Sequence, residues 1–236
     1  VALGQVASGI AHEINNPLGI ILCYTDLLKR QLTDIPSALP DVDVIEQQTM
    51  NCKKIVADLL QFSKKQENSK SPAQINKIIQ DVGQMFRHQL SKNNISLELE
   101  LDPDLPEITA SADKIQQVLV NLILNAMQAV GEKGSIVIQS THRKDHDAVA
   151  FAVWDDGPGV EAGIQQKIFD PFYSTKRIGE GTGLGLSVSY GIIQDHGGDI
   201  SLESERGKWT RFIVTLPLHH IPSSPGTQFP ITLGRE

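Results

Sequence analysis

The N-terminal part of the chain carries two long amphipathic helical patterns, and these limit the possible folds more than any other feature. On a helix that turns ~100° per residue, one side of residues 1–30 is apolar at three-, four- and seven-residue steps, with Leu3, Val6, Ile10, Ile14, Leu18, Ile21 and Leu28. After a proline-containing loop at 33–40, a second helix is apolar on one side, with Val42, Ile45, Cys52, Val56, Leu59 and Phe62. A two-helix hairpin has too little core to stand alone, so we expect it to pair with a second copy as a four-helix bundle.

One histidine on the first helix avoids its apolar side. His12 points roughly away from that stripe, towards solvent, with Glu13 next to it and Asn16 one turn further on. Pro17 should bend the helix just beyond, because proline lacks an N–H and its ring presses on the carbonyl of Glu13. For this stretch by itself, an ordinary solvated surface histidine is the default interpretation, and nothing within the stretch overturns it.

The bulk composition describes an ordinary globular protein. The chain has 236 residues, of which 40% are hydrophobic and 21% charged, and its net charge is −7. With no basic block, a nucleic-acid groove is not expected, and no apolar run approaches the ~20 residues of a membrane span. The chain begins inside a helical pattern without a signal peptide. We therefore expect a cytoplasmic C-terminal piece of a longer protein, which is compatible with an upstream sensor or membrane region.

The two cysteines, Cys23 and Cys52, are too few for a disulfide framework and suit a reducing compartment. Both fall on or near the apolar stripes of the two helices. We therefore predict that they are buried free thiols.

The pattern changes after a polar stretch that ends in Pro72. We predict a helical hairpin at 1–66, a hinge at 67–72, a mixed domain at 73–218 and a flexible Pro/Ser/Gly-rich tail at 219–236. Apolar periodicity in the mixed domain predicts helices at 74–90, 113–130, 161–168 and 184–196. Period-two alternation predicts strands at 95–101, 135–141, 148–154, 199–203 and 210–216. This is the pattern of an α+β two-layer sandwich, with one antiparallel sheet covered on one face by helices.

Two amides lie at the edge of an apolar helix in this domain. Asn121 and Asn125 are four residues apart and therefore share a helical face, off the centre of the apolar stripe. Neutral amide oxygens suit Mg²⁺ that already carries phosphate charge. Capping or contact with solvent would explain the pair equally well.

The segment Asp155-Asp156-Gly157-Pro158-Gly159 follows a predicted strand. Its glycines would let backbone approach a flat ligand closely, and a carboxylate at the strand end could accept a hydrogen bond from an exocyclic amine such as that of adenine. Taken alone, a D-x-G-x-G sequence is as often simply a turn.

A glycine-rich run opens the last predicted helix. Residues 179–186 (GEGTGLGL) would expose backbone N–H groups at a helix N-terminus, where phosphate binds. The run is neither a Walker A motif, since it has no G-K-[ST], nor a Rossmann motif, since no strand precedes it directly. Before it, residues 169–176 (FDPFYSTK) offer two aromatic anchors and a cation, which would suit a lid over a nucleotide.

Taken in order, these motifs resemble the N, G1, F and G2 boxes of the sensor histidine kinases. Residues 12–18 (HEINNPL) resemble their H box, most closely that of the nitrogen-regulator class. The resemblance covers residues 1 to about 218. It implies a dimeric four-helix bundle followed by an ATP-binding sandwich of the GHKL (Bergerat) type.

The resemblance also implies an activity. ATP would phosphorylate His12, and the phosphoryl group would pass to an aspartate of a response regulator receiver domain. Glu13 would act as general base, and Asn16 would place water when the same site removes phosphate from the regulator. Magnesium would be held by Asn121 and Asn125. The other ATP-binding residues implied are Asp155, Gly157, Gly159, Phe172, Lys176, Thr182, Gly183, Leu184 and Gly185.

The sequence departs from the family pattern at two points. Asp156 stands where an asparagine is common, which would make the pocket mouth more acidic. Gly207-Lys208-Trp209-Thr210 replaces a usual Gly-x-Gly-Thr, and because Trp209 cannot adopt a positive φ as cheaply as glycine, the turn there is expected to differ.

Two other classes of protein share this type of ATP site. A nucleotide-gated switch of the chaperone, gyrase or mismatch-repair type would lack the His12 helix and would carry a catalytic carboxylate on the asparagine helix, where this chain has Asn121 and Gln117. A scaffold without catalysis would not need the complete set of candidate groups found here. The stimulus, the receiver, and whether a chain phosphorylates itself or its partner stay open.

Overall fold

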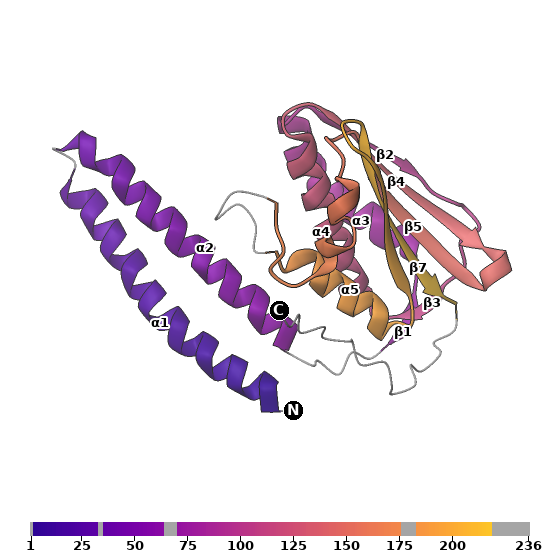
Figure 1. Cartoon of the computed structure of the whole chain (residues 1–236), viewed down its shortest axis with the longest axis horizontal. Coiled ribbons are helices and arrows are strands. Elements are labelled where there is room, and N and C mark those ends of the chain that lie inside the picture. The colour runs from indigo at the N-terminus through magenta and orange to yellow at the C-terminus, as the bar shows by residue number, and fades with distance from the viewer. Residues whose placement is uncertain (1, 33–34, 64–69, 176–182, 219–236) are drawn as a thin grey trace, which may run out of the picture.

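The computed structural model describes residues 2–32, 35–63, 70–175 and 183–218, and within the hairpin it leaves out some side chains, including those of residues 2–13 and 57–63. The N-terminal part is a hairpin of two long helices, α1 (Ala2–Gln31) and α2 (Leu39–Ser63), joined through a short 3₁₀ turn, η1 (Pro36–Ala38). Figure 1 shows the two helices lying along each other beside a sandwich of helices and strands. The two predicted helices are confirmed, and α1 continues through Pro17 without interruption.

Buried hydroxyls and one ion-pair group mark the packing of the two helices. Thr25 and Thr49 are buried, and each hydroxyl donates to a carbonyl of its own helix, at 2.8 Å to Leu22 and 2.7 Å to Ile45. Nearer the turn, Lys29 of α1 pairs with Asp43 of α2 at 2.7 Å and with Glu46. The carboxylates of Asp43 and then Glu46 raise the pKa of Lys29 above its ordinary value.

The single hairpin leaves an apolar line of α1 uncovered. Ile14, Ile21 and Leu28 are seven residues apart and 38%, 40% and 39% exposed. Cys23 and Cys52 are also exposed, so the prediction of buried thiols is wrong for the single chain. The reason is geometric, because α2 covers only the side of α1 that carries Thr25.

The second part is built on a five-stranded sheet with the order β2-β4-β5-β7-β6. Its strands are β2 (Ile95–Glu100), β4 (Gly134–Arg143), β5 (Ala148–Asp155), β6 (Asp199–Glu205) and β7 (Trp209–Pro217). All five predicted strands are confirmed. The expected antiparallel pairing is confirmed for β4–β5, β5–β7 and β6–β7, whereas the β2–β4 pair is parallel, contrary to that expectation.

A small second sheet was not predicted. Strand β1 (Ser71–Ala73) pairs antiparallel with β3 (Ile108–Ala110), so that the end of the predicted hinge is hydrogen-bonded into the domain. Three-residue strands are too short for alternation to be recognised. The short helical segment expected at 161–168 is present as two separate 3₁₀ turns, η3 (Ala162–Ile164) and η4 (Lys167–Phe169), instead of one continuous helix.

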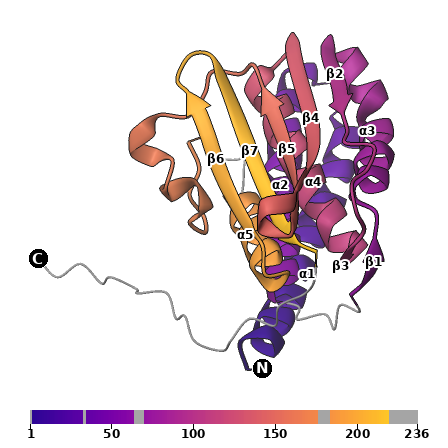
Figure 2. The ribbon, with the colours of Figure 1, turned by 90° about the vertical axis from the view of Figure 1, so that its right-hand side faces the viewer.

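Three helices cover one face of the large sheet, α3 (Ile75–Lys92), α4 (Ala112–Val130) and α5 (Gly185–Asp195). Figure 2 shows the strands side by side with these helices behind them. The core lies between the two layers, and its fully buried side chains include Ile79, Leu119, Leu122, Ile136, Phe151 and Ile193. Among the residues described, no helix is long and apolar enough to cross a membrane.

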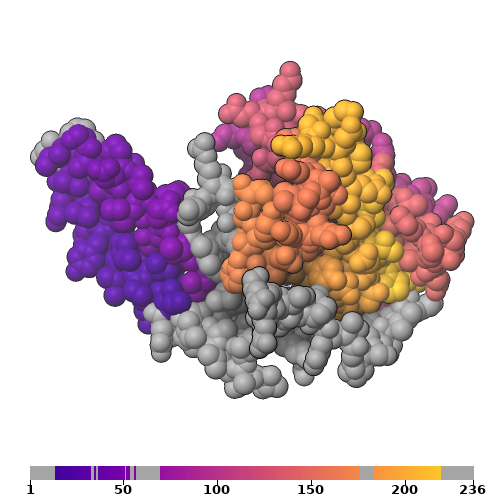
Figure 3. All heavy atoms as spheres, in the orientation of Figure 1, coloured from indigo at the N-terminus to yellow at the C-terminus, as the bar shows by residue number. Residues whose placement is uncertain are grey.

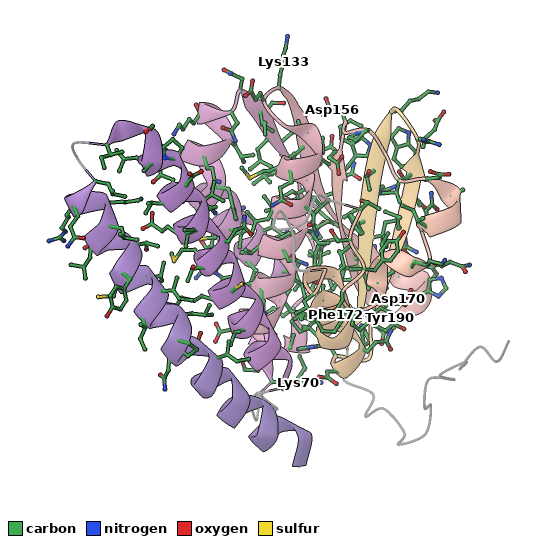
Figure 4. The ribbon with its side chains drawn as sticks, turned by 60° about the vertical axis from the view of Figure 1, so that its left-hand side comes forward. Lys70, Lys133, Asp156, Asp170, Phe172 and Tyr190 are labelled. Carbon is green, nitrogen blue, oxygen red and sulfur yellow. The ribbon has the colours of Figure 1, made fainter. Side chains whose placement is uncertain are left out.

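The end of α5 holds two other parts of the domain. The imidazole of His196, which is buried, receives the Ser111 N–H on Nε2 at 3.0 Å, and its Nδ1 lies 2.7 Å from the Ile192 carbonyl. Since Ser111 is the N-cap of α4, His196 fixes the C-terminal end of α5 to the start of α4. Lys70 Nζ donates to the carbonyl of Asp195 at 2.6 Å, which ties the chain entering β1 to the same end (Figure 4).

Candidate functional site

A cavity of about 540 Å³ opens between α4, α5 and the loops that follow β5. It gathers seven of the residues predicted from the sequence: Asn121, Asn125, Asp155, Gly159, Gly183, Leu184 and Gly185. Apolar side chains of α4, α5 and the 160–168 segment form much of the remaining wall, among them Val120, Leu124, Val160, Ile164, Ile168 and Leu186. A few polar groups in a largely apolar hollow are typical of a small-molecule site.

Asp155, the last residue of β5, is the buried acid of this cavity, with 2% of its surface exposed. Burial raises the pKa of its carboxyl to about 6, and the charge of Asp156 adds to this effect. The Gly157 N–H donates to Asp155 Oδ1 at 3.0 Å and opposes the rise. Because that bond fixes the carboxylate, its other oxygen is available to an N–H donor of a ligand.

The loop after Asp155 requires both of its glycines. A Cβ at Gly157 would lie 2.6 Å from Asp155 Oδ1 and 2.9 Å from Ala129 Cβ. Gly159 has φ +67° and packs against the Glu205 carbonyl, where a Cβ would overlap it. Gly157 does not line the cavity itself and acts on it through Asp155.

The two departures from the family pattern lie around this loop. Asp156 is exposed and accepts the Ser135 N–H at 2.8 Å, so it also holds the start of β4. In the β6–β7 turn the positive φ, +82°, falls on Gly207, whose N–H donates to Pro158 at 2.6 Å. Trp209 is already in β7, paired with Glu205. The turn therefore avoids the strain expected at Trp209.

The amide of Asn121 lies against the first turn of α5. Asn121 Nδ2 donates to Ser189 Oγ at 2.9 Å, and a Cβ at Gly185 would overlap Asn121 Oδ1. Leu184, the N-cap of α5, makes no side-chain cap hydrogen bond, and Gly183, Leu184 and Gly185 line the cavity, so the cavity includes the N-terminal end of a helix, where anions bind. Two amide oxygens beside such a phosphate site fit a magnesium ion that takes its other ligands from phosphate and water.

The segment that precedes α5 is anchored at its base. Phe169 packs on Tyr190 and Phe212 with ring centroids 5.9 Å and 6.4 Å apart, and Figure 3 shows this orange segment on the surface beside the yellow strands. Further along, the Phe172 N–H donates to the Gly183 carbonyl at 3.0 Å. Phe172 in the predicted lid is therefore bonded to Gly183 in the glycine-rich run.

Phe172 is not among the residues that line the cavity. Its side chain is 65% exposed and its φ is +66°, a rare backbone conformation for an aromatic residue. Figure 4 shows Phe172, with Asp170, at the opposite end of the domain from Asp156. Tyr173, Ser174 and Thr175 line the cavity instead. The predicted Lys176 and Thr182 lie outside the described residues.

All three predicted phosphotransfer residues belong to α1, and the structure describes the side chain of Asn16 alone among them. Asn16 is exposed on α1 and is absent from the cavity lining. The backbones of His12 and Glu13 belong to α1, but their side chains lie outside the described residues.

Thr210 and Ser189 are two of the cavity residues that the sequence analysis did not predict. Thr210 is buried and pairs with Asp155 across β5 and β7, and Ser189 of α5 bonds Asn121. Alternation in β7 could have placed Thr210 on the helix-covered face with Phe212 and Val214. The strand register and the α4–α5 contact carry no sequence signal of their own.

Comparison with known families identifies both parts of the chain. Residues 2–68 match the family "His Kinase A (phospho-acceptor) domain". Residues 110–220 match the family "Histidine kinase-, DNA gyrase B-, and HSP90-like ATPase". The second description also covers gyrase and HSP90, whereas the first is specific to histidine kinases.

The solved catalytic domain of histidine kinase ThkA is 37% identical, with a TM-score of 0.58 over 64% of this chain and 96% of that one. The chain belongs to the histidine kinase family. ThkA in complex with the response regulator protein TrrA matches this kinase chain over 92% of its length and 62% of that chain, with 32% identity and a TM-score of 0.69.

Curated sensor kinases match nearly all of this kinase chain. Sensor kinase CckA of Brucella abortus is 36% identical over 92% of the chain, and sensor histidine kinase ZraS of Escherichia coli K12 is 34% identical over 95%. The chain spans only 24% and 48% of the length of these two relatives.

Proposed function

We propose that this chain is the catalytic core of a two-component sensor kinase, which phosphorylates His12 from ATP and passes the phosphoryl group to an aspartate of a response regulator. The observation that carries the proposal is the convergence on one cavity of a buried carboxylate, two amides and the N-terminal end of a helix. A cavity of about 540 Å³ falls within the ~300–1,000 Å³ range of small-molecule sites.

The cavity residues divide into a base-binding set and a phosphate-binding set. Asp155 would accept the adenine amine, with Gly157 and Gly159 holding its loop. The backbone of Gly183, Leu184 and Gly185 would bind the phosphates at the start of α5. Lys176 and Thr182 are assigned to the phosphates from their place in the motif, and Phe172 to the base of the lid.

Magnesium would be held by the amide oxygens of Asn121 and Asn125, with Asn125 as the primary ligand. When bound, the ion would neutralise charge on the phosphates. The two residues therefore position the nucleotide's phosphate end, and positioning with charge neutralisation is most of what phosphoryl transfer requires.

In the chemical step, an imidazole nitrogen of His12 forms a bond to the γ-phosphorus of ATP. The bond from that phosphorus to the bridging oxygen of the β-phosphate breaks, ADP leaves, and Glu13 takes the proton from the other imidazole nitrogen. The phosphoryl group then moves to the receiver carboxylate. In the reverse regulatory role, Asn16 would hold the water that removes it, because an amide binds water through both its oxygen and its NH₂.

We further propose a homodimer through the apolar line of α1 and a cytoplasmic location for this part of the protein. We also propose that the part of the predicted 67–72 hinge before Lys70 lets the ATP domain reach His12, because Lys70, Ser71 and Pro72 are bonded into that domain. The exposure of Ile14, Ile21 and Leu28 supports the homodimer. The kinase–regulator complex of ThkA supports a receiver domain as the partner.

The test separates a kinase from a nucleotide-gated switch. Purified chain is incubated with γ-labelled ATP and Mg²⁺, and label on the protein and label released as phosphate are followed together. A kinase accumulates acid-labile, base-stable label and loses it to a purified receiver. Release of phosphate to water with no label on the chain would instead favour a switch of the gyrase or chaperone type.

A further inference from the structure

The carboxamide of Asn121 is held between two residues of α5 that are one helical turn apart. On one side, Ser189 Oγ accepts its Nδ2–H at 2.9 Å. On the other side, its Oδ1 lies so close to the α carbon of Gly185 that a Cβ there would overlap it. The amide therefore has a defined orientation, with nitrogen towards the middle of α5 and oxygen towards its first turn.

Electrostatics favour this orientation over the flipped one. The first turn of α5, whose N-cap Leu184 makes no side-chain cap, carries the positive end of the helix dipole, which attracts the amide oxygen. Ser189 is 1% exposed and lines the cavity, so its hydroxyl accepts the NH₂ group where water has little access. Without that acceptor, rotation about the Asn121 side chain would lose its restraint.

We propose that Ser189 is a positioning residue for the nucleotide's metal, because it fixes the Asn121 amide with its oxygen facing the phosphate end of the cavity. The inference rests on the proposed function, in which Asn121 contributes that oxygen to Mg²⁺. It goes further by assigning a role to a residue outside every motif recognised in the sequence. A simpler role, in which the bond only holds α4 against α5, makes different predictions.

The two roles differ in what Mg²⁺ does. If Ser189 acts through Asn121, its loss weakens ATP binding only when Mg²⁺ is present. Substituting Ser189 also has no further effect on ATP binding in a variant that already lacks the Asn121 side chain. If the bond only packs the helices together, ATP affinity falls equally with and without the metal, although the two substitutions are still coupled because they remove the same hydrogen bond.

The experiment measures ATP affinity by calorimetry in Mg²⁺ and in EDTA for the parent, Ser189→Ala, Asn121→Ala and the double variant. In Ser189→Ala, we expect ATP affinity in Mg²⁺ to fall roughly ten-fold, the size of one lost hydrogen bond, and ATP affinity in EDTA to change little. The double variant should match Asn121→Ala. Ser189→Thr, which keeps the hydroxyl, should retain the gain.

Ser140→Ala is the matched control. Ser140 is also buried and also bonds an asparagine, its hydroxyl donating to Asn76 Oδ1 at 2.7 Å, but it does not line the cavity. It should lower thermal stability and leave the Mg²⁺ gain intact, and thermal unfolding of every variant confirms folding.

Equal losses with Mg²⁺ and EDTA, additive effects in the double variant, or a loss in Ser189→Thr as large as in Ser189→Ala would overturn the role of Ser189. If Asn121→Ala itself keeps the full Mg²⁺ gain, the metal assignment of Asn121 fails together with this inference. Autophosphorylation of the parent chain, tested separately, decides the proposed function.

Discussion

At the residue scale, the buried carboxyl of Asp155 should destabilise the nucleotide-free protein at neutral pH. Its pKa is raised from 3.8 to about 6, so the folded state binds the proton more tightly than the unfolded state. Stability therefore falls as pH rises between these values. Asp155→Asn should raise the free energy of unfolding at pH 8 by roughly 1–3 kcal/mol, with the gain fading towards pH 4. Thermal unfolding across this pH range measures the effect.

Binding by Asp155 should have the opposite pH dependence. Only the ionised carboxylate is a full acceptor for the adenine amine, so affinity for ADP should rise as pH increases through about 6. Asp155→Asn should weaken ATP and ADP alike, by roughly 1.5–3 kcal/mol, and flatten the pH profile. A variant that lost both stability and binding at pH 8 would contradict this assignment.

Gly185 and Gly191 both lie in α5 but differ in the space around them, so their alanine variants can be compared directly. A Cβ at Gly185 would overlap Asn121 Oδ1, whereas a Cβ at Gly191 would meet nothing within 4 Å. Gly185→Ala should therefore reduce ATP affinity by about ten-fold or more. Gly191→Ala should leave affinity unchanged and stabilise the helix by roughly 0.5–1 kcal/mol. Calorimetric titration and thermal unfolding check both expectations. Equal ATP affinities of Gly185→Ala and Gly191→Ala would contradict the close approach of Asn121 to Gly185.

At the scale of the element, α1 should carry two separable activities on one face. Asn16 lies one helical turn from His12 and is exposed, where it can bind water beside a docked receiver. Asn16→Ala should keep most autophosphorylation and lose most dephosphorylation of the receiver. Glu13→Ala should do the reverse, with autophosphorylation lowered ~10²-fold or more, as for a missing general base.

The two assays use labelled ATP for the first activity and a pre-phosphorylated receiver for the second. Equal losses of both activities in both variants would mean that the substitutions only disturb the hairpin.

Helices and strands with a sustained apolar periodicity were predictable from the sequence. The strand pairings and the three-residue strands were not. The helices α1 to α5 and all strands of the large sheet follow from periodicity. The parallel pairing of Ile95 with Gly134 and the three-residue strands β1 and β3 depend on contacts distant in sequence. At the cavity, the motifs predicted Asp155 and Gly185. The motifs could not predict that the Phe172 side chain is exposed and absent from the cavity lining, because its backbone adopts a positive φ that the sequence does not reveal.

At the scale of the whole molecule, the apolar line of α1 should form the dimer interface. Ile21, 40% exposed, lies at its centre between Ile14 and Leu28. Ile21→Lys would bury a charge in the predicted four-helix core, which is costly without a partner. Light scattering should give twice the 25.8 kDa chain mass for the parent and the monomer mass for Ile21→Lys. Gln48→Lys, an exposed position on α2, should stay dimeric, and a dimeric Ile21→Lys would place the interface elsewhere.

The measurement that tests the central claim most directly is the transfer of label from γ-labelled ATP to His12. The parent chain with Mg²⁺ should gain an acid-labile, base-stable phosphate. His12→Ala should gain none while its affinity for ATP stays nearly unchanged, because the cavity lies in the other domain. His146→Ala, which removes an exposed histidine of the β4–β5 turn, should label as the parent does. Undiminished labelling of His12→Ala would contradict the account.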